Sequence, residues 1–146
     1  MPDESVKELA LLRLKERLEA IEDIEVGRNV AVPEKLRLGR YVAIADGEAE
    51  EIDPLLGNEG PFAYVHEISL ELSVQASKAT DRDAMYDRLE RDVGAALDAD
   101  LTLGGVVESM VRRPSAPPDI DGVAGAPEMK SGIMVVVVEY QSASRV

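Results

Sequence analysis

The segment from His66 to Ala76 constrains the fold of this chain more than any other. Apolar residues occupy every second position from Ile68 to Ala76, and Glu, Ser and Gln residues stand between them. A period of two over these eleven residues predicts a long β-strand with one dry face and one face turned to water or to a partner. The other predicted elements can be ordered around this strand.

Two helices are predicted from apolar residues at helical spacing. The first spans 4–20 and begins after Pro2 and Asp3, which suit a helix start. The second spans 80–99, with Thr80 as N-cap and Asp83 as the reciprocal capping carboxylate. Their apolar stripes are Ala10, Leu11, Leu14, Leu18 and Ile21 in the first helix and Met85, Leu89, Val93 and Leu97 in the second. Gly94 inside the second helix leaves room for close contact with a strand.

Strands are predicted at 24–30, 41–45, 62–76, 106–113 and 132–141. Gly27 within the first predicts a bulge or a close backbone approach, and Asp46-Gly47 predicts a turn. We expect a turn over Leu101–Gly105 and flexible loops near 46–61 and 114–131. The run Ile133–Val138 is apolar at every position. It predicts a strand covered on both faces, by helices on one and by a second sheet or a neighbouring subunit on the other.

The order α-β-β-β-α-β-β predicts an α+β fold: a mostly antiparallel sheet of about five strands with two helices packed on one face. The 146 residues are enough for one domain with its own core. No internal repeat or linker divides the sequence, so residues 1–146 are expected to form a single domain.

The composition argues against several classes of function. The net charge of −13 repels phosphate backbones, and an aromatic content of 3% offers few rings on which bases could stack. Cysteine is absent, so disulfides and thiolate chemistry are excluded. The acidic N-terminus is unlike a signal peptide, and Ile133–Val138 is too short to cross a bilayer. We expect a soluble protein made in a cytoplasm.

No motif indicates catalysis. His66, the only histidine, is expected to be a packed or edge residue. The acidic cluster Glu48–Asp53 is interpreted as a solvated loop. Asp119–Gly122 does not match a calcium loop, and Met129-Lys130-Ser131 does not match a phosphate-binding loop. We therefore expect no catalytic residue, no metal, no cofactor and no enzymatic activity.

Basic residues are scarce enough for their clusters to be candidate contacts. Arginines in a chain this acidic can dock on acidic patches of sister subunits, or they can simply balance surface charge. Apolar residues of the last strand are the other candidates for a subunit or partner interface. The candidate interface residues are Arg28, Arg37, Arg40, Arg112, Arg113, Val136 and Val138.

Three segments together carry a family resemblance. The first is Val26–Val30, followed by the basic loop 31–40 with its proline. The second runs from Asp87 through Ala95–Asp100 into Leu101–Glu108. The third is the Gly-, Ala- and Pro-rich loop that leads to Gly132 and Val135–Tyr140. In this order the segments resemble tail terminator (tail completion) proteins of long-tailed phages and related gene-transfer particles.

The resemblance implies a structural protein that caps the tail tube as a hexameric ring, ends tail polymerisation and provides the interface for head joining. Implied partners are further copies of the chain, the major tail tube protein and a head completion or neck protein. DNA would pass through the lumen without specific binding, and no membrane is involved. The implied location is the neck end of a virion tail assembled in bacterial cytoplasm. We expect the 31–40 and 114–131 loops to contact the tube or the neck.

Two alternatives stay open. Another head–tail connector or neck subunit would share a small acidic fold. A small ligand-binding domain or enzyme that dimerises through its sheet is the alternative from a different class, since carboxylate chemistry needs neither histidine nor cysteine.

Overall fold

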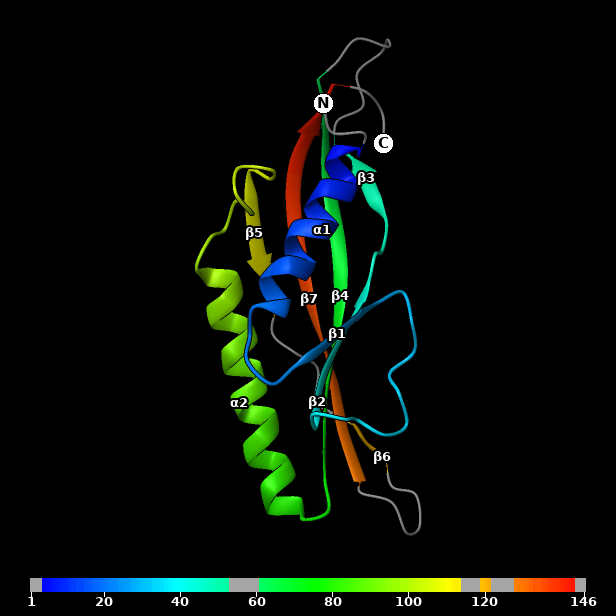
Figure 1. Cartoon of the computed structure of the whole chain (residues 1–146). Coiled ribbons are helices and arrows are strands. Elements are labelled where there is room, and N and C mark those ends of the chain that lie inside the picture. The colour runs from blue at the N-terminus through cyan, green and yellow to red at the C-terminus, as the bar shows by residue number, and fades with distance from the viewer. Residues whose placement is uncertain (1–3, 53–60, 114–118, 122–127, 144–146) are drawn as a thin grey trace.

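Two long antiparallel strands form the centre of the molecule, in a computed structural model that describes residues 4–52, 61–113, 119–121 and 128–143. Strand β4 (Phe62–Ala76) pairs with β7 (Glu128–Ser142) along the whole length of both, from Phe62 opposite Ser142 to Ala76 opposite Glu128 (Figure 1). The alternating segment His66–Ala76 lies in β4, as predicted, and its apolar positions from Ile68 to Val74 are buried.

Shorter strands pair with both sides of this central pair. They are β1 (Glu25–Arg28), β2 (Arg40–Ala45), β3 (Ala49–Glu51), β5 (Ser109–Arg112) and β6 (Asp119–Asp121). The order is β1-β2-β4-β7-β5, with β3 also on β4 and β6 also on β7. Strands β1 and β2 run parallel, and the other pairs are antiparallel. The predicted mostly antiparallel α+β fold is therefore confirmed, with seven strands among the described residues in place of about five.

Both helices pack on one face of the sheet. Helix α1 (Val6–Glu19) crosses the two long strands, and α2 (Ala79–Asp98) lies beside it (Figure 1). The predicted apolar stripes form one core with the inward residues of β2, β4 and β7: Ala10, Leu11, Leu14, Leu18, Leu89, Val93 and Leu97 are all buried. Ile21 and Met85 pack at the margin of this core. Burial of each large aliphatic side chain stabilises the fold by about 1.5–3 kcal/mol.

The predicted N-cap of the second helix is wrong. Helix α2 begins at Ala79, and its N-cap residue Lys78 makes no side-chain capping bond. Asp83 instead pairs with Lys130 on β7, 2.9 Å apart. The first turn is held by Arg82, whose buried guanidinium donates to the carbonyl of Ala76 at 3.0 Å and pairs with Glu128. For α1, Ser5 is the N-cap and accepts from the amide of Glu8; Pro2 and Asp3 lie outside the described residues.

Two predicted loops contain strand. Strand β3 falls within 46–61, and β6 and the first residues of β7 fall within 114–131. Both corrections have one cause: β4 and β7 extend beyond β2 and β5, so their open edges pair with short neighbouring segments. The strands expected at 24–30 and 106–113 are shorter, at 25–28 and 109–112. Residues 53–60, 114–118 and 122–127 of the predicted loops lie outside the described part of the chain.

The turn over Leu101–Gly105 is confirmed, and Asp100 holds it together. Its carboxylate accepts from the backbone amide of Thr102 at 2.9 Å, the hydroxyl of Thr102 at 2.7 Å and the amide of Gly104 at 2.7 Å. Arg17 of α1 donates to the same carboxylate at 2.8 Å. These bonds favour the charged form and lower the pKa of Asp100 to about 2.

The glycines singled out in the sequence lie at close approaches. A side chain at Gly27 would collide with the hydroxyl of Tyr41, and one at Gly94 would press on the guanidinium of Arg112 on β5. Gly47, in the predicted Asp46-Gly47 turn, has φ +66°, a conformation that favours glycine. A Cβ there would also collide with the carbonyl oxygen of Glu67 on β4.

Gly47→Ala should destabilise the protein strongly. Gly104→Ala is a matched control, because Gly104 also has positive φ (+73°) but nothing lies within 4 Å of its added Cβ. Both variants incur the backbone cost of about 1 kcal/mol. Gly47→Ala should lower the free energy of unfolding by a further 1–3 kcal/mol or so, because the collision must be relieved. Urea unfolding measures both; equal losses would show that the Glu67 contact does not matter.

Candidate assembly surface

The face of the sheet opposite the helices is open along β7 and β5 in the part of the chain that the structure describes. Strand register places Ile133, Val135 and Val137 of β7 on this outer face, with Val111 of β5 opposite Val137. Val111 is 61% exposed and Ile133 is 48% exposed, and Val135 and Val137 are half-buried. We call these four residues the outer stripe. Exposed aliphatic residues in a row are typical of a surface that another molecule covers.

Carboxylates flank the outer stripe. Strand β4 places Glu67 opposite Val137 and Glu71 opposite Ile133, and Glu139 follows Val137 on the same face of β7. Glu67 pairs with Arg113, with 2.5 Å between oxygen and nitrogen. Neither Glu71 nor Glu139 has an ion-pair partner in the described residues. A partner for this surface should therefore be apolar and basic.

The basic loop, residues 31–39, covers the other end of the outer face. Leu36 packs there on Tyr41 and Ala43 of β2, with Val32 and Met129 at the margin. Gln75 of β4 fixes the loop: its oxygen accepts from the amide of Leu36 at 2.7 Å, and its amide donates to the carbonyl of Glu34 at 2.9 Å. The loop is thus anchored to the sheet, and it leaves the outer stripe uncovered.

A shallow hollow of about 230 Å³ lies between the covered and uncovered parts of this face. Its lining includes Val30, which is 56% exposed, and Ile133. Ala43, Ala45, Ser69 and Glu71 line it as well. The lining is mostly small and apolar, with one unpaired carboxylate, so it suits an aliphatic side chain that has a cation beside it.

Arg28, one of the predicted interface residues, is engaged within the chain. Its guanidinium donates two bonds to Glu8 of α1, at 2.6 and 2.7 Å, and two to Asp46 after β2, at 2.7 and 2.9 Å. These bonds lower the pKa of both carboxyl groups and raise that of Arg28. Arg28 therefore joins the helix layer to the sheet, and four of its five N–H donors are used before any partner arrives.

Arg37 in the basic loop and Arg40, the first residue of β2, differ from each other. Arg40 is largely buried and donates to Asp92 of α2 at 2.9 Å and to the carbonyl of Glu22 at 3.2 Å. Arg37 contacts Glu25 at 3.0 Å, but its side chain is 80% exposed. Lys35 is exposed as well. Arg37 and Lys35 are thus accessible to a partner, whereas Arg40 connects elements of its own chain.

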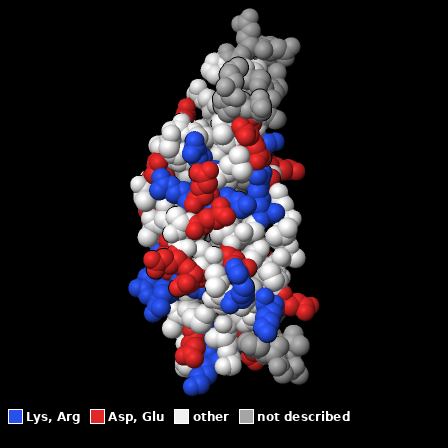
Figure 2. All heavy atoms as spheres, in the orientation of Figure 1, with Lys and Arg blue, Asp and Glu red and all other residues white. Residues whose placement is uncertain are grey.

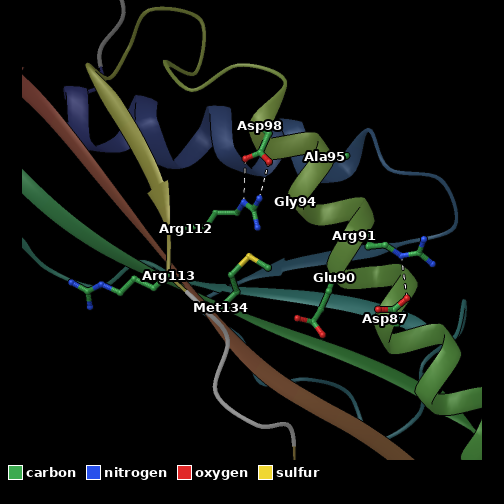
Figure 3. A pocket seen from close by; sticks show the side chains of 9 residues that line it. All are labelled: Asp87, Glu90, Arg91, Gly94, Ala95, Asp98, Arg112, Arg113 and Met134. Atoms are coloured by element: carbon green, nitrogen blue, oxygen red, sulfur yellow. Dashed lines mark hydrogen bonds and ion pairs between the residues drawn. The ribbon is translucent and has the colours of Figure 1, made fainter.

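Arg112 and Arg113 leave β5 in opposite directions. Figure 3 shows Arg112 turned towards α2, where it makes two bonds to Asp98, at 2.7 and 3.2 Å. Arg113 points away from this region, to the outer face.

A hollow of about 560 Å³ lies between α2 and β5, lined by Met134 and paired charges such as Arg91 with Asp87. Two of its carboxylates, Asp87 and Asp98, are each paired with an arginine.

Val136 and Val138 lie on the inner face. Both have no exposed surface and pack in the core beneath the helices. The residues that β7 offers to a partner are therefore the alternate positions Ile133, Val135 and Val137. Among the described residues, the predicted cover on both faces of this strand is present on one face only; a neighbouring subunit on the other stays a prediction.

His66 is a packed histidine, as predicted. It is fully buried, with Nδ1 3.1 Å from the Tyr140 hydroxyl and Nε2 2.5 Å from the Asp46 carbonyl oxygen. Because a carbonyl only accepts, Nε2 carries the proton and donates, and Nδ1 accepts from the hydroxyl. Burial lowers the pKa of His66 below 6.5 and raises that of Tyr140 to about 12. The pair is neutral and structural.

The helix side of the molecule carries mixed charge. Figure 2 shows acidic and basic side chains interspersed over the described part of this face. Within the described residues, no three His, Cys, Asp or Glu side chains gather closely enough to hold a metal ion. Neither described helix combines the length and apolar character that a membrane crossing requires.

Comparisons with known proteins add little. No protein-family model and no curated protein matches the sequence. Chains of solved structures do match, 27 in number. One belongs to a structure described as "Virion of native gene transfer agent (GTA) particle", with a TM-score of 0.40 and 13% identity, covering 94% of this chain and 92% of that chain. A similarity at this level carries no argument about function.

Protonation of His66 should destabilise the fold in mild acid. Its pKa is lowered in the folded state, so its contribution is complete above the unfolded value of about 6.5 and is lost as the pH falls. Since no other histidine is present, the free energy of unfolding should decline between about pH 6.5 and 5, by at most about 1.4 kcal/mol per unit. In His66→Gln the same interval should be flat. A flat curve for the unmodified chain would contradict the burial of a neutral imidazole.

Replacing Arg28 should cost far more stability than replacing Arg37. Arg28→Met keeps the aliphatic stem but leaves Glu8 and Asp46 without their cation, so we expect a loss of about 1–3 kcal/mol in unfolding free energy. Arg37→Met, at an exposed ion pair, should change it by less than about 0.5 kcal/mol. Urea unfolding at neutral pH compares the two. Similar effects would show that Arg28 is not a connection between layers.

Proposed function

We propose that this chain is a structural virion protein of the tail terminator type, which caps the tail tube of a phage-like particle as a homo-hexameric ring. In this role it ends tail polymerisation and provides the surface for head joining. The observation that carries the proposal is the outer stripe, an exposed aliphatic surface on a face that no element covers in the described residues. It is the surface expected of a protein that acts by assembling with copies of itself.

One of the three segments behind the sequence resemblance lies in the strand that builds most of this surface, and the other two lie elsewhere in the fold. Val26–Arg28 form β1, at one margin of the sheet, and Ala95–Asp98 close α2 before the Asp100 turn. Val135–Tyr140 lie in β7, which supplies most of the outer stripe. The resemblance and the exposed surface therefore support the same proposal from different observations.

Charge supports a passive path for DNA. Six chains at −13 each would carry −78, and a ring of that charge would let a phosphate backbone pass without adhering. The same charge opposes close approach of the subunits, so the contacts between them should be apolar or should pair cations with carboxylates. The tail tube protein and a head completion protein are the proposed neighbours on the two sides of the ring.

Deletion of the gene should give overlong tubes without heads in the producing cells. Electron microscopy of the particles, with complementation by the unmodified gene as control, makes the measurement. If the chain were instead a head–tail connector or neck subunit, its deletion would leave the tube length normal, so tube length distinguishes the two roles. Ordinary, infectious particles in the deletion strain would overturn the proposal.

A further inference from the structure

We infer that subunits associate by docking Leu38 of one chain on the outer face of the next, with Lys35 and Arg37 placed near the carboxylate of Glu71. The inference rests on the proposed function for its biological meaning. It assigns the occupant of the outer stripe and the adjacent hollow to a second copy of this chain.

The surface to be covered is defined by two properties. It is aliphatic, with Val111 and Ile133 about half exposed, and small residues are among those that line the hollow beside it. It is also acidic, because Glu71 and Glu139 have no ion-pair partner among the described residues. A second copy must therefore present a large apolar side chain with cations next to it.

Three exposed large apolar side chains in the described residues lie outside the stripe and hollow: Leu38 (42%), Ile52 (38%) and Leu101 (48%). Ile52 follows Glu50 and Glu51, and Leu101 follows Asp98 and Asp100. Docking Ile52 would bring carboxylates against Glu71, a repulsion that costs affinity. The carboxylates beside Leu101 are already paired with Arg17 and Arg112, so docking Leu101 would bring Glu71 no free cation.

Leu38 is the exposed side chain with the opposite surroundings. Arg37 precedes it and Lys35 lies three residues earlier, both exposed. Its loop is fixed to the sheet through Leu36 and Gln75. A pre-anchored loop loses little conformational freedom on binding, which favours association. The neighbouring cations and the anchored loop both favour Leu38 as the side chain that docks.

The two surfaces are different parts of the outer face. The basic loop projects beside β1 and β2, whereas β5 forms the other margin (Figure 1). A contact between two different surfaces of identical chains is heterologous, and such contacts close into rings when the rotation between subunits permits. This assignment differs from the tube or neck contact that the sequence led us to expect for the 31–40 loop.

Disulfide trapping tests the contact directly, because the chain has no cysteine. The full-length variants Leu38→Cys and Ile133→Cys are mixed and oxidised, both as free protein and after incorporation into particles. We expect a 38–133 linked dimer in large excess over either self-linked dimer. The double variant should give a ladder of linked chains that ends at the ring size. Leu101→Cys mixed with Ile133→Cys is the matched control and should not link.

A charge exchange provides an independent readout that does not depend on cysteine geometry. Lys35→Glu and Glu71→Lys alone should each weaken self-association about tenfold, because like charges then meet. The two together should restore it to within a few-fold. Arg88→Glu, an exposed change on α2, is the control and should leave association unchanged. Sedimentation velocity measures the association constants.

The outcomes separate this inference from the proposed function. Absence of the 38–133 product from both samples, or linkage of residue 133 to a tube or neck protein, overturns the inference, and failure of the charge exchange to restore association counts against it. Overlong tubes in the deletion strain together with such a result would retain the proposed function and discard this contact. Linked rings, together with ordinary particles from the strain that lacks the gene, would support this contact and overturn the proposed function.

Discussion

The pairing of β4 with β7 is the interaction on which the rest of the structure depends. Fifteen residues of each strand pair without interruption, and β2, β3, β5 and β6 all pair with one of the two. The register divides the valine run of β7 between two environments. Val136 and Val138 face the helices, and Val135 and Val137 face outward. A slip by one residue would exchange these sets and remove both the core and the outer stripe.

The sequence was informative wherever a local pattern had one interpretation. The alternation in β4 and the apolar stripes of both helices predicted the fold class and most of the core. The two short strands β3 and β6 escaped prediction because they exist only where β4 and β7 offer an open edge, which is a tertiary effect. The N-cap at Thr80 failed for a similar reason, since the distant Glu128 and the carbonyl of Ala76 hold Arg82 and so fix the first turn.

The candidate interface shows the same limit more sharply. An all-apolar run does not reveal which of its residues point outward, so Val136 and Val138 were named although they are buried. The polar residues after the run carried part of the missing signal: Glu139 and Gln141 have odd numbers, as do the outward residues of β7. Before the run this signal fails, because Lys130 has an even number and pairs with Asp83 of α2. For the arginines no local signal existed, because the partners of Arg28 and Arg40 are 18 to 52 residues distant. The sequence shows that a residue is charged, but it does not show whether the residue's ion-pair partner lies in the same chain.

The burial of His66 has a consequence for how the protein responds to its surroundings. It is the one side chain whose ordinary pKa lies near neutrality, and it is enclosed between Tyr140 and the carbonyl of Asp46. The chain has 29 acidic and 16 basic side chains, and its net charge is therefore constant while the fold is intact near neutral pH. Repulsion between neighbouring copies is then set by dissolved ions, whose screening length is about 10 Å at 0.1 M. Ionic strength, rather than acidity, becomes the natural control of association.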